Sequence, residues 1–82
     1  MKTFCVSYDL ISKIKDYDSV NEILENLKGE HIQGSVWLLR LDDKYTCKSL
    51  LNEILKYVNE YDIDLYVAQI IQHSRHKSKN DL

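Results

Sequence analysis

The sequence predicts a small two-layer α+β domain with the element order βαββαβ. Apolar and polar residues alternate near the start of the chain, as they do in a strand with one buried face. Two later segments carry apolar residues at helical spacing, and β-rich segments follow each of them. Because the chain has 82 residues, it has room for one domain.

The first predicted element is a strand over residues 2–10, KTFCVSYDL. Its larger apolar side chains, Phe4, Val6 and Tyr8, alternate with smaller ones, which is the period of two expected of a strand. Residues 11–18 lose this alternation, and we expect a polar loop there.

A helix is predicted to begin at Ser19 and to end at Gly29. Ser19 is a candidate N-cap, and Glu22 follows three residues later, where it would complete a capping box. The apolar residues between them recur at helical spacing and form one core-facing stripe: Val20, Ile23, Leu24 and Leu27. Gly29 is expected to adopt the left-handed conformation that ends many helices.

Two strands are predicted next, a short one over residues 30–33 and a longer one over residues 35–41. The longer segment, SVWLLRL, is rich in residues that favour strands. Gly34 separates the two segments and is a candidate for a bend, a bulge or a tight hairpin.

A second helix and a last strand complete the expected order. Thr46 follows a turn and is a candidate N-cap. The helix that it would start has this apolar stripe: Leu50, Leu51, Ile54, Leu55 and Val58. The run DLYVAQII over residues 64–71 predicts the final strand. With right-handed crossovers, this order gives a ferredoxin-like sandwich, an antiparallel sheet with both helices on one face.

Both faces of the predicted sheet are apolar, although two helices can cover only one of them. We place Trp37, Leu39, Tyr66 and Ile70 on the uncovered face. Such a patch is large enough to mark an interaction surface. Because burying each large side chain contributes roughly 1.5–3 kcal/mol, we expect a homodimer that joins two sheets face to face.

Composition restricts the possible classes of function. Cys5 and Cys47 have neither the spacing of metal ligands nor the density of a disulfide scaffold, which indicates a reducing compartment. No apolar run approaches the roughly 20 residues that span a bilayer, so we expect a cytoplasmic protein with no membrane partner. The sequence contains no P-loop and no dinucleotide-binding glycine pattern, which disfavours a nucleotide-cofactor enzyme.

Charge is distributed unevenly along the chain. The net charge is −2, but residues 73–82 carry three basic side chains against Asp81, a net +2, which leaves −4 on the rest. We expect residues 1–72 to form the domain and residues 73–82 to form a basic, flexible tail. Two interpretations of the tail stay open: a solvated, frayed terminus, or an arm that contacts phosphates. A histidine metal site is disfavoured, because no helix is expected there to align His73 and His76.

Asp9 is the candidate catalytic residue. It ends the first strand on the same face as Cys5 and Ser7, the face expected to form the dimer. A carboxylate near an apolar interface costs several kcal/mol unless it is paired, protonated or bound to a metal. Two copies of Asp9 near a two-fold axis would suit Mg²⁺ or Mn²⁺, which activates water against a phosphodiester. Alternatively, Asp9 caps the following loop through its own backbone.

Four segments together resemble the CRISPR-associated protein 2 superfamily. They are FCVSYDL, the loop ending in Asp16 and Tyr17, IQGSVWLLRL, and DIDLYVAQI near the end of the chain. The resemblance spans residues 2–71 and is greatest to the stand-alone branch, which includes virulence-associated protein D. It implies a ferredoxin-like fold, a dimer with facing sheets, and an acidic residue near the dimer axis, which falls on Asp9. The run from Ser35 to Trp37 matches the family's serine–hydrophobic–aromatic segment.

The resemblance implies two classes of function. The first is a metal-dependent nuclease acting on RNA or double-stranded DNA, with Asp9 as the catalytic and metal-binding residue. Its phosphate contacts would come from the basic residues Lys13, Lys15, Arg75, Lys77 and Lys79. The second is a non-catalytic dimer that bridges partners in a CRISPR, phage-defence or toxin–antitoxin system. A regulatory domain that binds a small ligand is a third, less favoured class.

Two departures from the family bear on the catalytic function. Nuclease-type members often carry an arginine pair soon after the aspartate, where this chain has Ser12, Lys13 and Lys15. The overall charge is acidic, whereas a protein that bridges duplex DNA usually presents a basic surface. Both departures weaken the catalytic and integration-complex interpretations, and neither affects the predicted fold.

Overall fold

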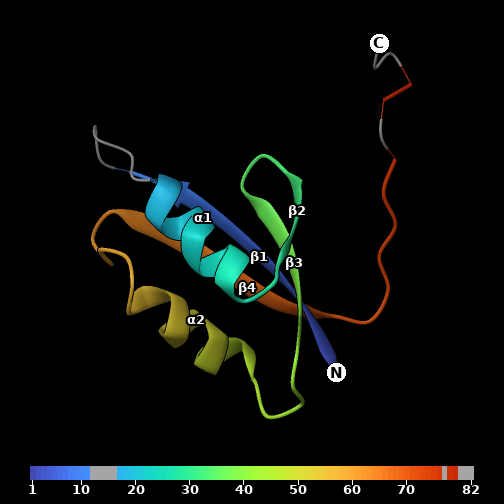
Figure 1. The fold of residues 1–82 in the computed structure, drawn as a ribbon, viewed down its shortest axis with the longest axis horizontal. Helices are drawn as coiled ribbons and strands as arrows, with labels where there is room; N and C mark the ends of the chain where they lie inside the picture. The colour runs from blue at the N-terminus through green and yellow to red at the C-terminus, as the bar shows by residue number, and fades with distance from the viewer. Residues whose placement is uncertain (12–16, 77, 80–82) are drawn as a thin grey trace.

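The computed structural model describes residues 1–11, 17–76 and 78–79. It contains six elements in the predicted order (Figure 1). These are β1 (Lys2–Leu10), α1 (Tyr17–Asn26), β2 (Glu30–Gln33), β3 (Val36–Leu41), α2 (Cys47–Leu55) and β4 (Ile63–Ile70). The predicted α+β class and the ferredoxin-like βαββαβ arrangement are therefore confirmed.

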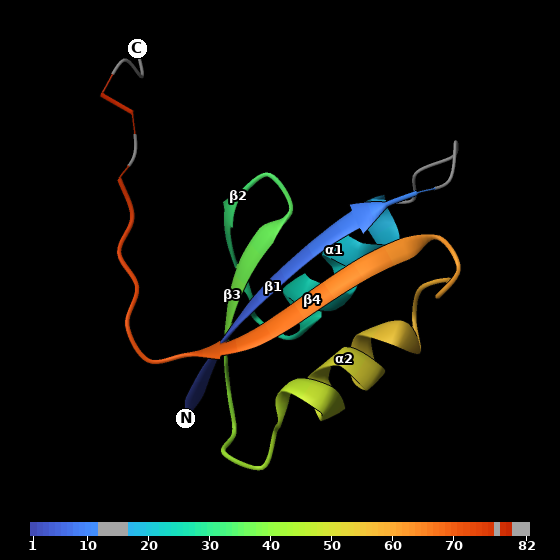
Figure 2. The same ribbon diagram turned by 180° about the vertical axis from the view of Figure 1, so that it is seen from behind.

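The four strands form one antiparallel sheet in the order β2-β3-β1-β4. The long strand β1 lies inside the sheet and pairs with β3 on one side and β4 on the other. Both helices lie on one face of the sheet, and the opposite view leaves the other face in front (Figures 1 and 2). We call this second face the open face.

The core lies between the sheet and the two helices. Phe4 and Val6 of β1 are completely buried, as are Leu24 of α1 and Leu50 and Ile54 of α2. The alternation predicted for β1 is confirmed, because Phe4, Val6, Tyr8 and Leu10 are buried while Asp9 is exposed. The odd-numbered residues of β1 consequently belong to the open face.

Trp37 and Leu39 belong to this core, so their predicted place on the open face is wrong. The register pairs Leu39 with Phe4 and Trp37 with Val6, and directly paired residues share one face of a sheet. Leu39 is 0% exposed and Trp37 is 3% exposed. Alternation shows which residues of a strand share a face, but only the pairing with β1 decides which face that is.

Tyr66 and Ile70 lie on the open face, where the sequence analysis placed them. They pair with Ser7 and Thr3 of β1, whose odd-numbered residues point away from the helices. Tyr66 is 66% exposed. A role for both residues in a dimer stays a prediction.

Helix α1 starts and ends differently from the prediction. It begins at Tyr17, so Ser19 lies inside the helix instead of capping it. The left-handed residue at its end is Lys28, with φ of 58°, instead of Gly29. The Gly29 amide donates to the Leu24 carbonyl at 2.9 Å and the Lys28 amide donates to the Glu25 carbonyl at 2.8 Å, the two bonds of a Schellman motif.

The predicted start of α2 and the predicted β2–β3 turn are confirmed. The Thr46 side chain accepts a hydrogen bond from the Ser49 amide, and the Ser49 hydroxyl accepts one from the Thr46 amide, which forms a capping box. Gly34 has φ of +48° in the turn, and a bulge lies between His31 and Gln33.

After β4 the chain turns at the end of the sheet and runs back on the side where β2 lies (Figures 1 and 2). The Arg75 guanidinium donates a hydrogen bond from Nη2 to the Ile32 carbonyl of β2 at 2.6 Å. This bond ties the tail to the edge strand of the sheet. Among the residues that the structure describes, no helix has the length and apolar character to span a membrane.

Candidate active site

The open face is apolar along its middle and acidic at one end. Its residues follow from the strand register and come from all four strands: Thr3, Cys5, Ser7 and Asp9 of β1, Glu30 and Gln33 of β2, Val36, Leu38 and Arg40 of β3, and Asp64, Tyr66, Ala68 and Ile70 of β4. The acidic end is the carboxyl end of β1, where β4 begins. The basic residue Arg40 lies at the other end, opposite Thr3.

Asp9 lies directly opposite Asp64 across the β1–β4 pairing, and both side chains are exposed. Opposed residues in an antiparallel pair have Cβ atoms about 4.5–5.5 Å apart, and like charges at that spacing destabilise the sheet. Within the described part of the chain, neither carboxylate forms a hydrogen bond or an ion pair. The two carboxylates therefore form an acidic pair that a cation would stabilise.

A shallow pocket of about 160 Å³ surrounds the acidic pair. It is lined by residues of β1 and β4: Ser7, Tyr8, Asp9, Asp64, Leu65 and Tyr66. The Ser7 hydroxyl adds a third oxygen donor, and the exposed ring of Tyr66 adds an aromatic surface. Hard cations such as Mg²⁺ prefer oxygen ligands of this kind.

The oxygen ligands in this pocket suit a metal ion that takes its other ligands from water and substrate. The described residues contain no group of three or more His, Cys, Asp or Glu side chains that could hold a metal ion. Mg²⁺ usually keeps several waters and binds through one or two carboxylates together with substrate phosphates. Asp9 and Asp64 match that pattern, so the residues present fit the expected Mg²⁺ or Mn²⁺.

Tyr8 supports the strand behind this pocket. Its hydroxyl donates to the Asn21 side-chain oxygen of α1 at 2.7 Å. Burial raises the pKa of the Tyr8 hydroxyl, so this donor stays protonated at neutral pH. The hydrogen bond fixes α1 over the end of β1 that carries Asp9.

The predicted phosphate-contacting residues are only partly described. Lys13, Lys15 and Lys77 lie outside the described residues. The alternative role of Asp9, as a cap of the loop that follows β1, is not seen at Ile11, whose amide donates to the Asp62 carbonyl at 2.8 Å, and residues 12–16 lie outside the described residues. Arg75 lines a different pocket from that of Asp9, and Lys79 is exposed in the tail.

Asp64 belongs to this site, although the sequence did not predict a role for it. Asp64 lies in the segment DIDLYVAQI, but its position opposite Asp9 depends on the register between two strands far apart in the sequence. The sequence does place one acid near the end of the first strand and another near the start of the last strand. An antiparallel pairing of these two strands brings such positions together.

The fold and the acidic strand end define a ferredoxin-like domain whose open face carries a candidate metal site. The model of the family "CRISPR associated protein Cas2" matches residues 1–78. The chain therefore belongs to the CRISPR-associated Cas2 family, and the resemblance found in its sequence is confirmed at the level of the family. Membership of the stand-alone branch stays a prediction. No curated protein matches the chain.

Proposed function

We propose that this Cas2-family protein is a homodimeric, divalent-metal-dependent nuclease acting on RNA or double-stranded DNA. The observation that carries the proposal is the direct opposition of Asp9 and Asp64 on the open face. Their carboxylates would hold the Mg²⁺ or Mn²⁺ ion and orient it toward a bound phosphodiester.

The acidic body of the chain favours RNA over duplex DNA. Residues before the tail carry a net −4, whereas duplex DNA has a high density of phosphate charge.

The proposed dimer buries the part of the open face formed by β1 and β4. With Trp37 and Leu39 in the core, the apolar contacts come from Tyr66, Ala68 and Ile70. A two-fold axis near the acidic end would bring a second copy of Asp9 and Asp64 alongside the first. The second copy then supplies carboxylates that one chain lacks.

The residues of the site have distinct roles in the proposed reaction. A divalent ion, when bound, lowers the pKa of a coordinated water and stabilises the charge that develops on the phosphate. Asp9 and Asp64 would hold and orient that ion, with the Ser7 hydroxyl as a third oxygen ligand. The basic tail attracts the backbone of the substrate.

A cleavage assay with purified protein tests the proposal. RNA and duplex DNA are incubated with wild type, Asp9→Asn and Asp64→Asn, with Mn²⁺ or with a chelator. We expect the chelator to abolish cleavage and each substitution to reduce it by on the order of 100-fold or more. Glu60→Gln is the matched control, because Glu60 is an exposed acid outside the open face.

Thermal unfolding of each variant shows whether it remains folded. Full activity in folded Asp9→Asn would contradict the proposed role of Asp9.

The second candidate function is a non-catalytic dimer that bridges partner proteins or nucleic acid of a defence or toxin–antitoxin system. It is supported by the acidic body of the chain and by the described residues, which contain no group of three or more His, Cys, Asp or Glu side chains that could hold a metal ion. Metal-independent binding by a stable dimer, without cleavage of either substrate, would favour this function.

A further inference from the structure

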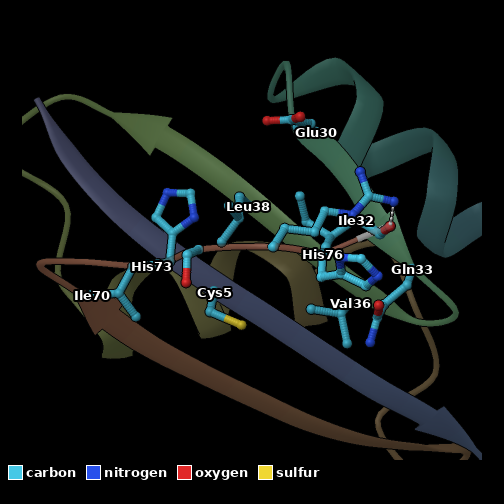
Figure 3. A pocket seen from close by; sticks show the side chains of 11 residues that line it. Cys5, Glu30, Ile32, Gln33, Val36, Leu38, Ile70, His73 and His76 are labelled. Atoms are coloured by element: carbon cyan, nitrogen blue, oxygen red, sulfur yellow. Dashed lines mark hydrogen bonds between the residues drawn. The ribbon is translucent and has the colours of Figure 1, made fainter. Parts of the chain in front are cut away.

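The two edges of the sheet differ in how well they are protected. The β2 edge is four residues long and contains the bulge. The tail runs beside it, where Arg75 donates to the Ile32 carbonyl (Figure 3). Short strands, bulges and covering segments keep other chains from pairing with the edge of a sheet. The β2 edge is therefore closed to a further strand.

The β4 edge is long and regular. It has eight residues, contains neither proline nor lysine, and carries Asp64 as its single charged side chain. Within the part of the chain that the structure describes, no strand pairs with its outer side. A long edge without such protection is a place where another strand can add to the sheet.

The register shows which backbone groups of β4 point outward. The Ile11 amide donates to the Asp62 carbonyl at 2.8 Å, so these two residues form a hydrogen-bonded pair across β1 and β4. In an antiparallel pairing, such pairs alternate with pairs whose N–H and C=O groups point away from each other. Counting along the register from Asp62, the outward groups include those of Leu65, Val67 and Gln69. These groups can form the hydrogen bonds of a fifth strand.

Helix α2 contacts β4 and lies on the outer side of the sheet in both views of the fold (Figures 1 and 2). Tyr57, in the turn after the helix, lines a pocket with residues of α1, so this side of α2 faces α1. At 3.6 residues per turn, Leu51 and Leu55 lie on the other side of the buried stripe formed by Leu50 and Ile54, and both are half-buried. We call Leu51 and Leu55 the α2 flank. It offers an apolar surface to the side chains of a strand placed beside β4.

This arrangement admits a single strand but not a second copy of the chain. Neighbouring strands are about 4.8 Å apart, whereas a helix with its side chains is about 10–12 Å wide. A second copy joined through β4 would bring its own α2 to the same face of the sheet, where the two helices would overlap. The chain's own tail lies at the other edge, beside β2. The occupant is therefore an extended segment of another protein.

Lys48 gives this site a preference for negative charge. Its side chain is exposed, and it precedes Leu51 by three residues, which places the two on one side of the helix. Among the described residues, no ion pair involves Lys48. Because α2 runs antiparallel to β4, Lys48 is near the end of β4 that carries Gln69 (Figure 1). A segment antiparallel to β4 would have its N-terminal end there.

We propose that the outer edge of β4 and the α2 flank bind an extended segment of another protein, which adds to the sheet as a fifth, antiparallel strand. Apolar side chains at alternate positions of the segment pack against Leu51 and Leu55, and an acidic residue near its N-terminal end pairs with Lys48. The edge lies at the side of the sheet and the flank on its helix face, so the dimer proposed for the open face leaves both accessible. The inference is independent of the proposed nuclease.

Fluorescence anisotropy with a designed peptide tests the inference on the full chain. The probe is a fluorescein-labelled peptide of about eight residues, in which valine alternates with threonine after an N-terminal aspartate. Val67→Pro removes an outward N–H without breaking a hydrogen bond to β1, and it is expected to lower the affinity roughly tenfold. Val67→Ile keeps this N–H and the apolar side chain, and it is expected to bind within about twofold of wild type.

A charge reversal tests the same site without altering the edge. Lys48→Glu is expected to weaken binding of the probe about three- to fivefold. Lys44→Glu is the matched control, because Lys44 lines a pocket with Ser49 and Glu53, away from the α2 flank. A second probe with lysine in place of the aspartate is expected to bind Lys48→Glu more tightly than wild type.

Hydrogen exchange locates the bound probe. The amides of Leu65, Val67 and Gln69 are expected to exchange rapidly in the free protein and slowly when the probe is bound. The amides of Tyr66 and Ala68, which point toward β1, are expected to exchange slowly in both states.

Three outcomes would overturn the inference. The first is unchanged exchange of the outward amides at a saturating concentration of probe. The second is equal binding by folded Val67→Pro and Val67→Ile, with thermal unfolding as the check that both are folded. The third is a fall in molecular mass of Val67→Pro in sedimentation equilibrium without probe, which would show that a second copy occupies the edge.

Discussion

Two glycines show how the same residue type is required for different reasons. A Cβ added to Gly29 would lie 2.9 Å from the Leu24 carbonyl oxygen and 3.1 Å from the Trp37 ring, so this position requires the absence of a side chain. A Cβ at Gly34 would meet nothing within 4 Å, but φ there is +48°, so this position requires conformational freedom. The sequence predicted that α1 ends at Gly29. It did not predict that packing excludes a side chain there, because the close approach of Trp37 is a tertiary contact.

Substitution of these two glycines is expected to give different losses of stability. Gly29→Asn should lower the free energy of unfolding by about 1–3 kcal/mol, because backbone and indole atoms must shift. Gly34→Asn should cost less than about 1 kcal/mol, because asparagine tolerates the left-handed conformation. Urea denaturation measures both values. A larger loss in Gly34→Asn than in Gly29→Asn would contradict the packing argument.

The buried Tyr8 hydroxyl predicts a loss of stability at alkaline pH. Burial raises its pKa above the ordinary value of 10.0, so the folded state binds its proton more tightly than the unfolded state. The stabilisation is complete below pH 10.0 and is lost as the pH rises through the raised pKa. Wild type should therefore lose more stability than Tyr8→Phe as the pH rises above 10.0, as measured by urea denaturation. Parallel losses in both proteins would contradict the prediction.

At the scale of elements, local sequence patterns predicted the strands and helices, while their relative placement depends on pairing. The capping signal at Thr46 was sufficient because both of its partners lie within three residues. The sequence could not predict on which face of the sheet Trp37 and Leu39 lie, because that depends on the pairing of β1 with β3. The same limit applies to Asp64, which meets Asp9 only through the pairing of β1 with β4.

The β2–β3 hairpin is stabilised by a stack of His31 on Trp37. Their ring centroids are 4.6 Å apart and their planes differ by 9°. His31→Ala should lower the free energy of unfolding by about 0.5–1.5 kcal/mol, whereas His31→Phe should retain most of the stacking. Trp37 is the only tryptophan in the chain, so its fluorescence emission reports this contact directly. Identical emission spectra of wild type and His31→Ala would show that the stack does not form in solution.

At the scale of the molecule, the open face divides into two parts, of which the tail borders one. The β1–β4 part carries the acidic pair and the exposed Tyr66, and we assign it to a second copy of the chain. The β2–β3 part is bordered by the tail, which Arg75 ties to β2. The sequence indicated an apolar open face and a basic tail, but not this division, because it depends on where the chain returns after β4.

The proposed dimer predicts different effects of two tyrosine substitutions. Tyr66→Glu should yield monomers at micromolar concentration, because it introduces a charge into the apolar part of the interface and next to the acidic pair. Tyr61→Glu is the matched control, since Tyr61 is 84% exposed and lies in the loop before β4. Sedimentation equilibrium measures the molecular mass of each. A dimeric Tyr66→Glu, or a wild type that is monomeric at high concentration, would contradict the proposed interface.

The most direct test of the account is the binding of Mn²⁺ to the purified protein, measured by electron paramagnetic resonance without any substrate. The opposition of Asp9 and Asp64 predicts that wild type binds Mn²⁺ and that Asp9→Asn and Asp64→Asn each lose most of this binding, whereas Glu60→Gln retains it. Mn²⁺ binding that is absent from wild type, or that is unchanged in folded Asp9→Asn, would contradict the assignment of the metal site.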